Sequence, residues 1–262
     1  MLNPSFFNSI FVFPILNLLV LLYKVFLLVK LPGAFGLAII GLTILIRGLF
    51  QPFFKQQMEM SKKMQDLKPH LDRLNEKHKN DQKQLQQEQL KLYQQEGINP
   101  ASGCLFMIIQ IPVFIALYQT LSLFLLKGQG AQVITQINKV LYAPWLKIAS
   151  IDPWFFGLNL AVTPQKSGQW YYLLIPLVTG LLQYFQAIAM TPPSTNLPAV
   201  QGQKDKKDDS GDFQKAMTTQ MKFLFPLMIG WFAYTLPFGL SLYWNIFSLF
   251  SIIQGRQLKV KN

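Results

Sequence analysis

Long apolar segments alternate with polar segments along this chain, and their lengths predict its elements. A helix that crosses the roughly 30 Å hydrocarbon core of a bilayer needs about 20 apolar residues. Five segments come close to this requirement, and we expect each to be a transmembrane helix: 33–54, 103–126, 170–190, 220–236 and 239–257. The last two are short and meet at a turn around Pro237, which predicts a helical hairpin in a thin part of the membrane.

The N-terminal segment 1–32 is apolar but interrupted. Its run from Phe6 to Val29 contains Asn8, Pro14, Asn17 and Lys24. We expect an amphipathic helix that lies along the outer membrane surface. A sixth span remains open as the alternative, because only Asn17 and Lys24 interrupt residues 15–29. No Lys or Arg precedes Lys24, so we expect no cleaved signal peptide.

The segment 55–98 changes to Gln, Lys and Glu, and its apolar residues follow a heptad pattern. The spacing of four, three, four and three is typical of a coiled-coil seam. The seam consists of Met60, Met64, Leu67, Leu71 and Leu74. Residues 79–81 read as a turn, so we expect two helices folded back as a hairpin, with Pro69 breaking or starting a helix. A solvated connector is the alternative interpretation.

The other polar segments are predicted loops. Residues 127–169 are rich in aromatic side chains that suit a membrane interface, which favours an external loop. Residues 191–219 begin with a Pro-rich stretch of mixed charge, which predicts a flexible loop. Residues 258–262 form a short C-terminal tail.

Charge assigns the sides of the membrane. The chain has 262 residues, 51% of them hydrophobic and 14% charged, which excludes an ordinary soluble domain. Much of the net charge of +12 comes from Lys and Arg within 55–91, 204–222 and 256–261. The positive-inside rule therefore places these segments and the C-terminus in the cytoplasm, and the residues before Phe35 outside. We expect a multi-pass membrane protein without sequence-specific nucleic-acid binding.

Several functional classes find no support in the sequence. The lone Cys104 excludes an internal disulfide, and His70 and His78 have no acidic or Cys partners at metal-ligand spacing. Hydrolase, nucleotide-binding and zinc-protease motifs are absent from the sequence. We therefore expect no catalytic residue, no cofactor and no metal.

Arg47 is the most informative residue, because it lies inside an apolar run while the other apolar runs contain no carboxylate. A charge at membrane depth normally faces the protein interior or a water-filled cavity. Thr43, Arg47 and Gln51 are four residues apart and would share one helix face. Other spans could add polar groups to the same cavity: Gln110, Gln183, Gln186, Asn245 and Ser248. Snorkelling of Arg47 and simple interhelical hydrogen bonding are the alternatives.

Four sequence pieces, taken in order, resemble the YidC family of membrane protein insertases. They are FGLAIIGLTILIRGLFQPF around Arg47, MQDLKPHL with LYQQEGINP in the hairpin, GCLFMIIQIPVFIALYQTL, and FPLMIGWFAYTLPFGLSLYWNIFSLFSIIQ. The resemblance covers about residues 6–257 and is to the short bacterial form, which is related to mitochondrial and thylakoid insertases. It adds Tyr243 and Trp244, in the Tyr-Trp piece, to the expected groove.

The resemblance implies an all-α fold: a five-transmembrane-helix insertase core with a cytoplasmic hairpin that receives clients. Newly made membrane proteins would enter the bilayer through a hydrophilic groove that contains Arg47. The implied partners are nascent membrane proteins and the lipid bilayer, and roles for the ribosome, signal recognition machinery and secretion channel stay open. A small anion channel or transporter, or a structural membrane assembly factor, is the alternative.

Overall fold

The computed structural model describes residues 2–78, 81–98, 102–125, 130–190 and 210–260. Its long helices are α1 Phe13–Leu28, α2 Ala34–Leu49, α3 Gln51–Asp66, α6 Ser102–Leu125, α8 Leu174–Met190, α9 Ser210–Thr235 and α10 Phe238–Val260. Shorter elements are a π-helical turn Asn8–Val12, α4 Lys68–Lys77, α5 Gln82–Gln95, α7 Ala131–Lys139, strands β1 Trp154–Phe155 and β2 Leu158–Asn159, and 3₁₀ turns Pro144–Leu146, Pro164–Lys166 and Trp170–Leu173. The described chain is therefore mostly helical.

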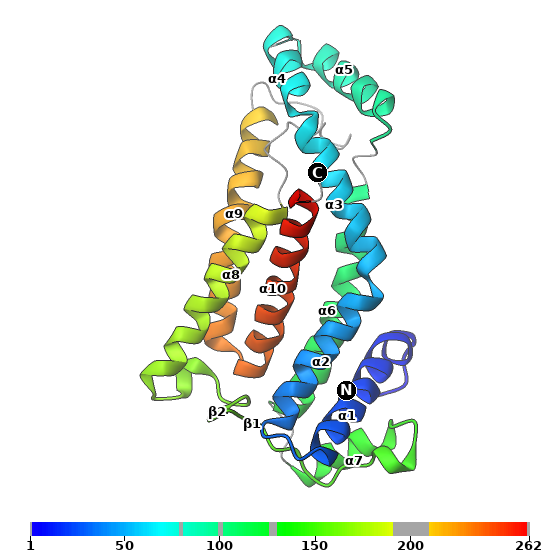
Figure 1. The fold of residues 1–262 in the computed structure, drawn as a ribbon, viewed down its shortest axis with the longest axis vertical. Coiled ribbons are helices and arrows are strands. Elements are labelled where there is room, and N and C mark those ends of the chain that lie inside the picture. The colour runs from blue at the N-terminus through cyan, green and yellow to red at the C-terminus, as the bar shows by residue number, and fades with distance from the viewer. Residues whose placement is uncertain (1, 79–80, 99–101, 126–129, 191–209, 261–262) are drawn as a thin grey trace.

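The long helices stand side by side, with α10 between α8 on one side and α2 on the other (Figure 1). Helix α9 packs along α8, and α6 lies against α3 and α10. The α4–α5 hairpin is at one end of the bundle, whereas β1, β2 and α7 are at the other (Figure 1). The buried face of α10 thus meets both halves of the bundle.

Two helices in the described part of the chain are long and apolar enough to cross a membrane, Asn8–Leu28 and Trp170–Ala189. A third appears if α2 and α3 count as one bent span. Shorter apolar helical segments are Ile111–Leu125 and Phe223–Thr235. These lengths agree with an all-α membrane protein, and the count of five spans stays a prediction.

The first expected span, 33–54, is divided at Phe50. The segments Ala34–Leu49 and Gln51–Met64 are bent by 62° relative to each other. Pro52 has no N–H to donate to the carbonyl of Gly48, and a missing hydrogen bond of this kind is an ordinary cause of a kink. The bend changes the direction of every side chain after Phe50.

The N-terminal helix α1 contacts the segment between α6 and α8 along half of its length. Asn17 donates from Nδ2 to the Val140 carbonyl (3.1 Å), and its Oδ1 accepts from the Tyr142 N–H (2.7 Å). Lys24 donates to the Trp145 carbonyl. Asn17 lies about 16 Å along the helix from Leu28, at 1.5 Å per residue. These contacts favour a helix lying beneath the loop, although its length also suits a span.

The segment between α6 and α8 closes one end of the bundle. β1 and β2 form a two-stranded antiparallel hairpin, with Phe155 opposite Leu158. The Phe155 ring lies against the start of α2, where a Cβ added to Gly36 would approach its Cδ2 to 2.2 Å. Gly33 is also beside this ring, and its φ of +73° favours glycine. Only glycine leaves room for Phe155 here.

The same loop is also hydrogen-bonded to the turn between α9 and α10. The N–H of Phe238 donates to the Val162 carbonyl (3.0 Å), and that of Gly239 donates to the Leu160 carbonyl (2.9 Å). Leu160 is fully buried. We call residues 131–173 the outer cap, because they join α1, α2 and the α9–α10 turn.

The α4–α5 hairpin and the end of α3 share a small core, separate from that of the helix bundle. Pro69 lies in the first turn of α4, as expected of a helix start. Asp81 caps α5 by accepting from the Gln84 N–H (3.0 Å). The core consists of Met64, Leu67, Leu71, Tyr93 and Ile98, with Met60 and Leu92 packed against it.

Two expected boundaries need correction. α9 begins at Ser210, ten residues before the expected start at 220, so part of the expected loop 191–219 is helical. The polar residues there include Gln and Lys, which form helices readily outside a membrane. α10 continues to Val260, into the expected tail. Residues 191–209 lie outside the described part of the chain.

Candidate functional site

Arg47 lies in the last turn of α2 and is 1% exposed. Its Nη2 donates to the Phe247 carbonyl (2.8 Å) and to the Ser251 hydroxyl, both on α10. The side chain therefore joins α2 to α10 across a separation of about 200 residues in sequence. In this structure Arg47 is enclosed by protein rather than by open water.

Two phenyl rings surround the cation. The Cζ atom of Arg47 is 4.0 Å from the Phe54 ring centroid and 3.7 Å from that of Phe247. The ring planes meet at 70°, with centroids 6.4 Å apart, so they form a wedge around the guanidinium rather than a parallel sandwich. Each ring can contribute about 0.5–2 kcal/mol of cation–π attraction. We call Phe54 and Phe247 the aromatic wedge.

The guanidinium retains donors without acceptors. Nε and Nη1 are buried and make no hydrogen bond within the described residues. The ion pairs found in the described part of the chain are Lys55–Glu59 and Lys91–Glu88, and neither involves Arg47. A buried, incompletely paired cation costs several kcal/mol. Such a group is a candidate binding site for an anionic ligand.

Further polar side chains are buried around this position, and most hydroxyls bond within their own helix. Thr43 donates to the Ile39 carbonyl (2.7 Å), Thr179 to that of Ile175 (2.8 Å) and Ser248 to that of Trp244 (2.8 Å). These bonds to the carbonyl four residues back satisfy the hydroxyls without joining helices. Interhelical hydrogen bonding by these hydroxyls therefore does not explain their burial.

The remaining expected groove residues divide between two faces of α10 and the neighbouring helices. Gln183 is 5% exposed on α8, and Gln186 is partly buried one turn further along. The partly buried Asn245 has an Oδ1 that accepts no bond from the described residues. The Tyr243 ring lies 5.9 Å from that of Phe247 in a tilted arrangement, whereas Trp244 stacks on Phe114 of α6.

Two expected groove residues cannot be placed beside Arg47. Gln51 is exposed at the start of α3, beyond the bend at Phe50. Its place in the groove stays a prediction. The side chain of Gln110 lies outside the described part of the structure.

The expected client-receiving surface of the hairpin is largely buried. Met64, Leu67 and Leu71 are 0–6% exposed, and Met60 and Leu74 are partly buried. Tyr93 and Ile98 cover the seam. The heptad seam is thus satisfied inside the hairpin, and a client would contact it only after the helices separate.

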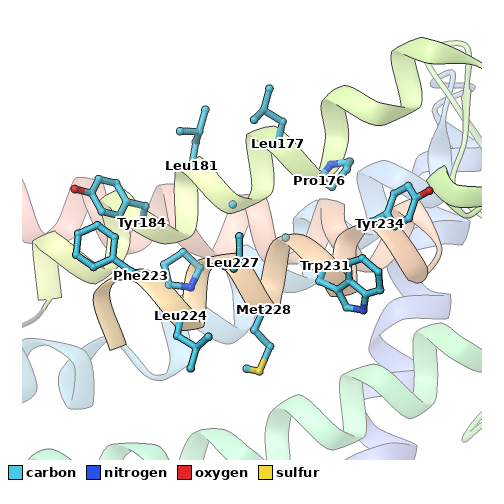
Figure 2. A pocket seen from close by; sticks show the side chains of 13 residues that line it. Pro176, Leu177, Leu181, Tyr184, Phe223, Leu224, Leu227, Met228, Trp231 and Tyr234 are labelled. Atoms are coloured by element: carbon cyan, nitrogen blue, oxygen red, sulfur yellow. The ribbon is translucent and has the colours of Figure 1, made fainter. Parts of the chain in front are cut away.

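An apolar groove with a volume of about 810 Å³ lies between α8 and α9. Tyr184 and Phe223 lie together at one end, and Trp231 and Tyr234 at the other (Figure 2). A Cβ added to Gly230 would lie 3.4 Å from the Pro176 carbonyl and 3.7 Å from the Gly180 Cα, so the backbones approach closely. Small residues permit such close packing of membrane helices. The groove contains no charged residue and does not include Arg47.

The sequence did not indicate Phe54, Phe247 or Ser251 as part of the site. The signal was present on α10, since Tyr243, Phe247 and Ser251 are four residues apart and share a face. It was hidden among 22 phenylalanines and the neighbouring polar residues. Within the described residues, no three His, Cys, Asp or Glu side chains come together as metal ligands.

Comparison with known proteins finds one matching family model and several similar sequences. The family model described as "60Kd inner membrane protein" matches residues 27–262. The chain is 30% identical to the membrane protein insertase MisCA of Bacillus subtilis, over 98% of this chain and 80% of that protein. It is 29% identical to the membrane protein insertase YidC of Oceanobacillus iheyensis, over 96% of this chain and 83% of that protein.

Chloroplast proteins are similar as well. The chain is 34% identical to the inner membrane protein ALBINO3 of Arabidopsis thaliana, over 88% of this chain and 48% of that protein. It spans about half the length of the chloroplast relatives that it matches.

Proposed function

This chain belongs to the 60Kd inner membrane protein family, which includes the YidC, MisCA and ALBINO3 proteins, and from that membership we propose that it is a membrane protein insertase. It moves short polar segments of newly made membrane proteins across a bacterial inner membrane and releases their apolar segments into lipid. Its partners are nascent membrane proteins and the bilayer. The five expected spans form the core, with the α4–α5 hairpin and the C-terminus in the cytoplasm.

The single observation that carries this proposal is the state of Arg47. The cation is buried between α2, α3 and α10, and its Nε and Nη1 have no acceptor in the described residues. A client that enters with an acidic residue supplies the missing acceptor. At 4 Å and an effective dielectric constant near 20, that attraction is about 4 kcal/mol, against about 1 kcal/mol in bulk water.

Polar surroundings lower the barrier to translocation. Each unpaired polar group of a client costs several kcal/mol in hydrocarbon. Thr43, Thr179, Gln183, Ser248 and Ser251 provide buried polar atoms along α2, α8 and α10. When α10 moves away from α2, these side chains line a hydrophilic groove with Arg47. The distance over which a client lacks polar partners then becomes shorter.

The two ends of the molecule have different roles. The outer cap closes the bundle with backbone hydrogen bonds and Phe155, so the groove opens only toward the cytoplasm and the lipid. Apolar side chains on α8 and α9 are widely exposed, among them Leu177 at 59% and Leu227 at 73%, and suit contact with lipid. The α4–α5 hairpin receives clients by opening its seam, in which Met64 gives an adaptable surface.

Reconstitution tests this function. Purified protein in liposomes should insert a short single-span client without ATP, whereas protein-free liposomes should not. The client's N-terminal tail should become protected from an external protease. An anion channel would instead release trapped chloride and leave the client accessible, and a purely structural assembly factor would do neither. Chloride release without client protection contradicts the proposal.

A further inference from the structure

The hydrogen bonds of Arg47 limit how a carboxylate can approach it. A guanidinium has five N–H donors in a fixed plane, and a carboxylate binds most strongly through two parallel bonds. One such edge combines the Nε hydrogen with one Nη2 hydrogen. The other combines one Nη1 hydrogen with the second Nη2 hydrogen. Both edges therefore need Nη2.

Nη2 is the nitrogen that α10 occupies. It donates to the Phe247 carbonyl and to the Ser251 hydroxyl, whereas Nε and Nη1 donate to none of the described residues. Single bonds from Nε or Nη1 remain available to a ligand. A carboxylate can form two parallel hydrogen bonds with the guanidinium only if one of the two acceptors on α10 releases its Nη2 hydrogen.

Ser251 is the acceptor that can be exchanged. The Phe247 carbonyl belongs to the α10 backbone, while the Ser251 hydroxyl can rotate about its Cα–Cβ bond. Ser251 also donates to the Phe247 carbonyl (3.0 Å), so its hydroxyl has an acceptor of its own while it holds Nη2. Ser251 is 2% exposed, which shields this bond from solvent competition.

The aromatic wedge restricts the approach further. Phe54 and Phe247 lie 4.0 and 3.7 Å from Cζ of Arg47 in planes that meet at 70°, so they fill part of the space around the guanidinium. A paired contact still needs one of the two edges that include Nη2. An incoming carboxylate can therefore change from one hydrogen bond to two only when the Ser251 hydroxyl leaves Nη2.

We propose that Ser251 is a positioning residue that latches Arg47 and sets how strongly the insertase favours clients with acidic tails. The inference rests on the proposed function and deepens it. In the closed state Ser251 and the Phe247 carbonyl hold both Nη2 hydrogens. A client carboxylate displaces the Ser251 hydroxyl, forms the paired contact and loosens α10 from α2. A neutral amide tail forms no paired contact with Nη2, so it does not compete with the Ser251 hydroxyl and its insertion rate does not depend on it.

The test compares clients that differ only in their tails. The rate of insertion of a client with an acidic tail is divided by that of its amide counterpart, for the parent and for Ser251→Ala. Removal of the competing hydroxyl should raise this ratio about tenfold, the factor equivalent to about 1.4 kcal/mol. Ser251→Thr keeps a hydroxyl and should return the ratio toward that of the parent. An unchanged or lower ratio in Ser251→Ala contradicts the latch.

Ser241→Ala is the matched control. Ser241 is fully buried on the same helix, ten residues away, or about 15 Å along the helix axis. It makes no contact with Arg47, so the ratio should stay at the parent value. A rise equal to that in Ser251→Ala would assign the effect to general loosening of α10 and overturn the proposal.

A spectroscopic test needs no client. The three arginines of the chain are Arg47, Arg73 and Arg256, and the last two are exposed. In an Arg73→Lys, Arg256→Lys background, nitrogen-15 arginine labelling reports Arg47 alone. Both Nη2 hydrogens should exchange slowly with water, and Ser251→Ala should make one exchange faster. Equal protection in both proteins refutes the latch, whereas failure of the parent to insert any client refutes the proposed function separately.

Discussion

Replacing Gly36 with alanine should loosen the outer cap. The new Cβ would lie 2.2 Å from Cδ2 of Phe155, whereas carbon atoms normally stay about 3.5–4.0 Å apart. Either α2 and the cap move apart, which costs about 1–3 kcal/mol as overpacking, or Phe155 leaves its site. In that second case the lost burial of a phenylalanine costs about 1.5–3 kcal/mol. Both routes predict a destabilisation of similar size.

Gly48→Ala is the matched control. Gly48 lies in the same helix, and an added Cβ meets no atom within 4 Å. Alanine there should be neutral or stabilise the helix by up to about 1 kcal/mol. The free energies of unfolding of the two variants in the same detergent should therefore differ by about 1–4 kcal/mol.

A double-mutant cycle identifies the cause. Phe155→Ala removes the ring that Gly36→Ala would strike. Gly36→Ala should therefore lower the free energy of unfolding much less in the Phe155→Ala background than in the parent. If Gly36→Ala unfolds at the same temperature as Gly48→Ala, the close approach of Phe155 to α2 does not secure the cap. Additive effects in the cycle would lead to the same conclusion.

Three further predictions follow from the packing. Leu71→Ala should cost the hairpin about 2–5 kcal/mol, because Leu71 is fully buried there, and limited proteolysis should then cut residues 68–95 while the spans remain intact; cleavage within the spans would contradict an independent hairpin core. Gly230→Val should separate α8 from α9 and lower the unfolding temperature, whereas Gly180→Ala, at ordinary contact distances of 3.7–3.9 Å, should not; equal effects would refute close backbone packing. Cysteines that replace the exposed residues Gln136 and Lys77 should react with impermeant reagents from opposite sides of the membrane. A cysteine that replaces Asn3 should react from the same side as the one at Gln136 if α1 lies on the outer surface. Reaction of Asn3→Cys from the side of Lys77 would make α1 a span.

The lengths of the apolar segments, together with residues such as Pro69, predicted most helices. Apolar segments anticipated α6, α8 and α10 within a few residues, because the bilayer fixes the length of a spanning helix. Pro69 indicated the start of α4. The seam predicted which hairpin residues are buried, although not that Tyr93 and Ile98 cover them. The start of α9 was missed, since polar residues outside a membrane give no apolar signal.

The candidate site was only partly predictable. Burial of Arg47 followed from the composition of its own segment. Its partners Phe247 and Ser251 are about 200 residues away, and a single sequence does not show which faces of two helices meet. The expected stripe of residues 43, 47 and 51 assumed a straight helix, whereas a bend separates the helix of Gln51 from that of Thr43 and Arg47. The match of Phe155 to Gly33 and Gly36 likewise depends on tertiary packing.

The central claim is that Arg47 acts as a buried positive charge that receives acidic segments of clients. The most direct measurement is insertion into liposomes of paired clients with acidic and amide tails by the parent, Arg47→Lys and Arg47→Ala. Attraction of about 4 kcal/mol at an effective dielectric constant near 20 predicts a large loss for the acidic client in Arg47→Ala, a small loss for the amide client, and substantial retention in Arg47→Lys. If Arg47→Ala inserts the acidic client as fast as the parent does, capture by charge is wrong.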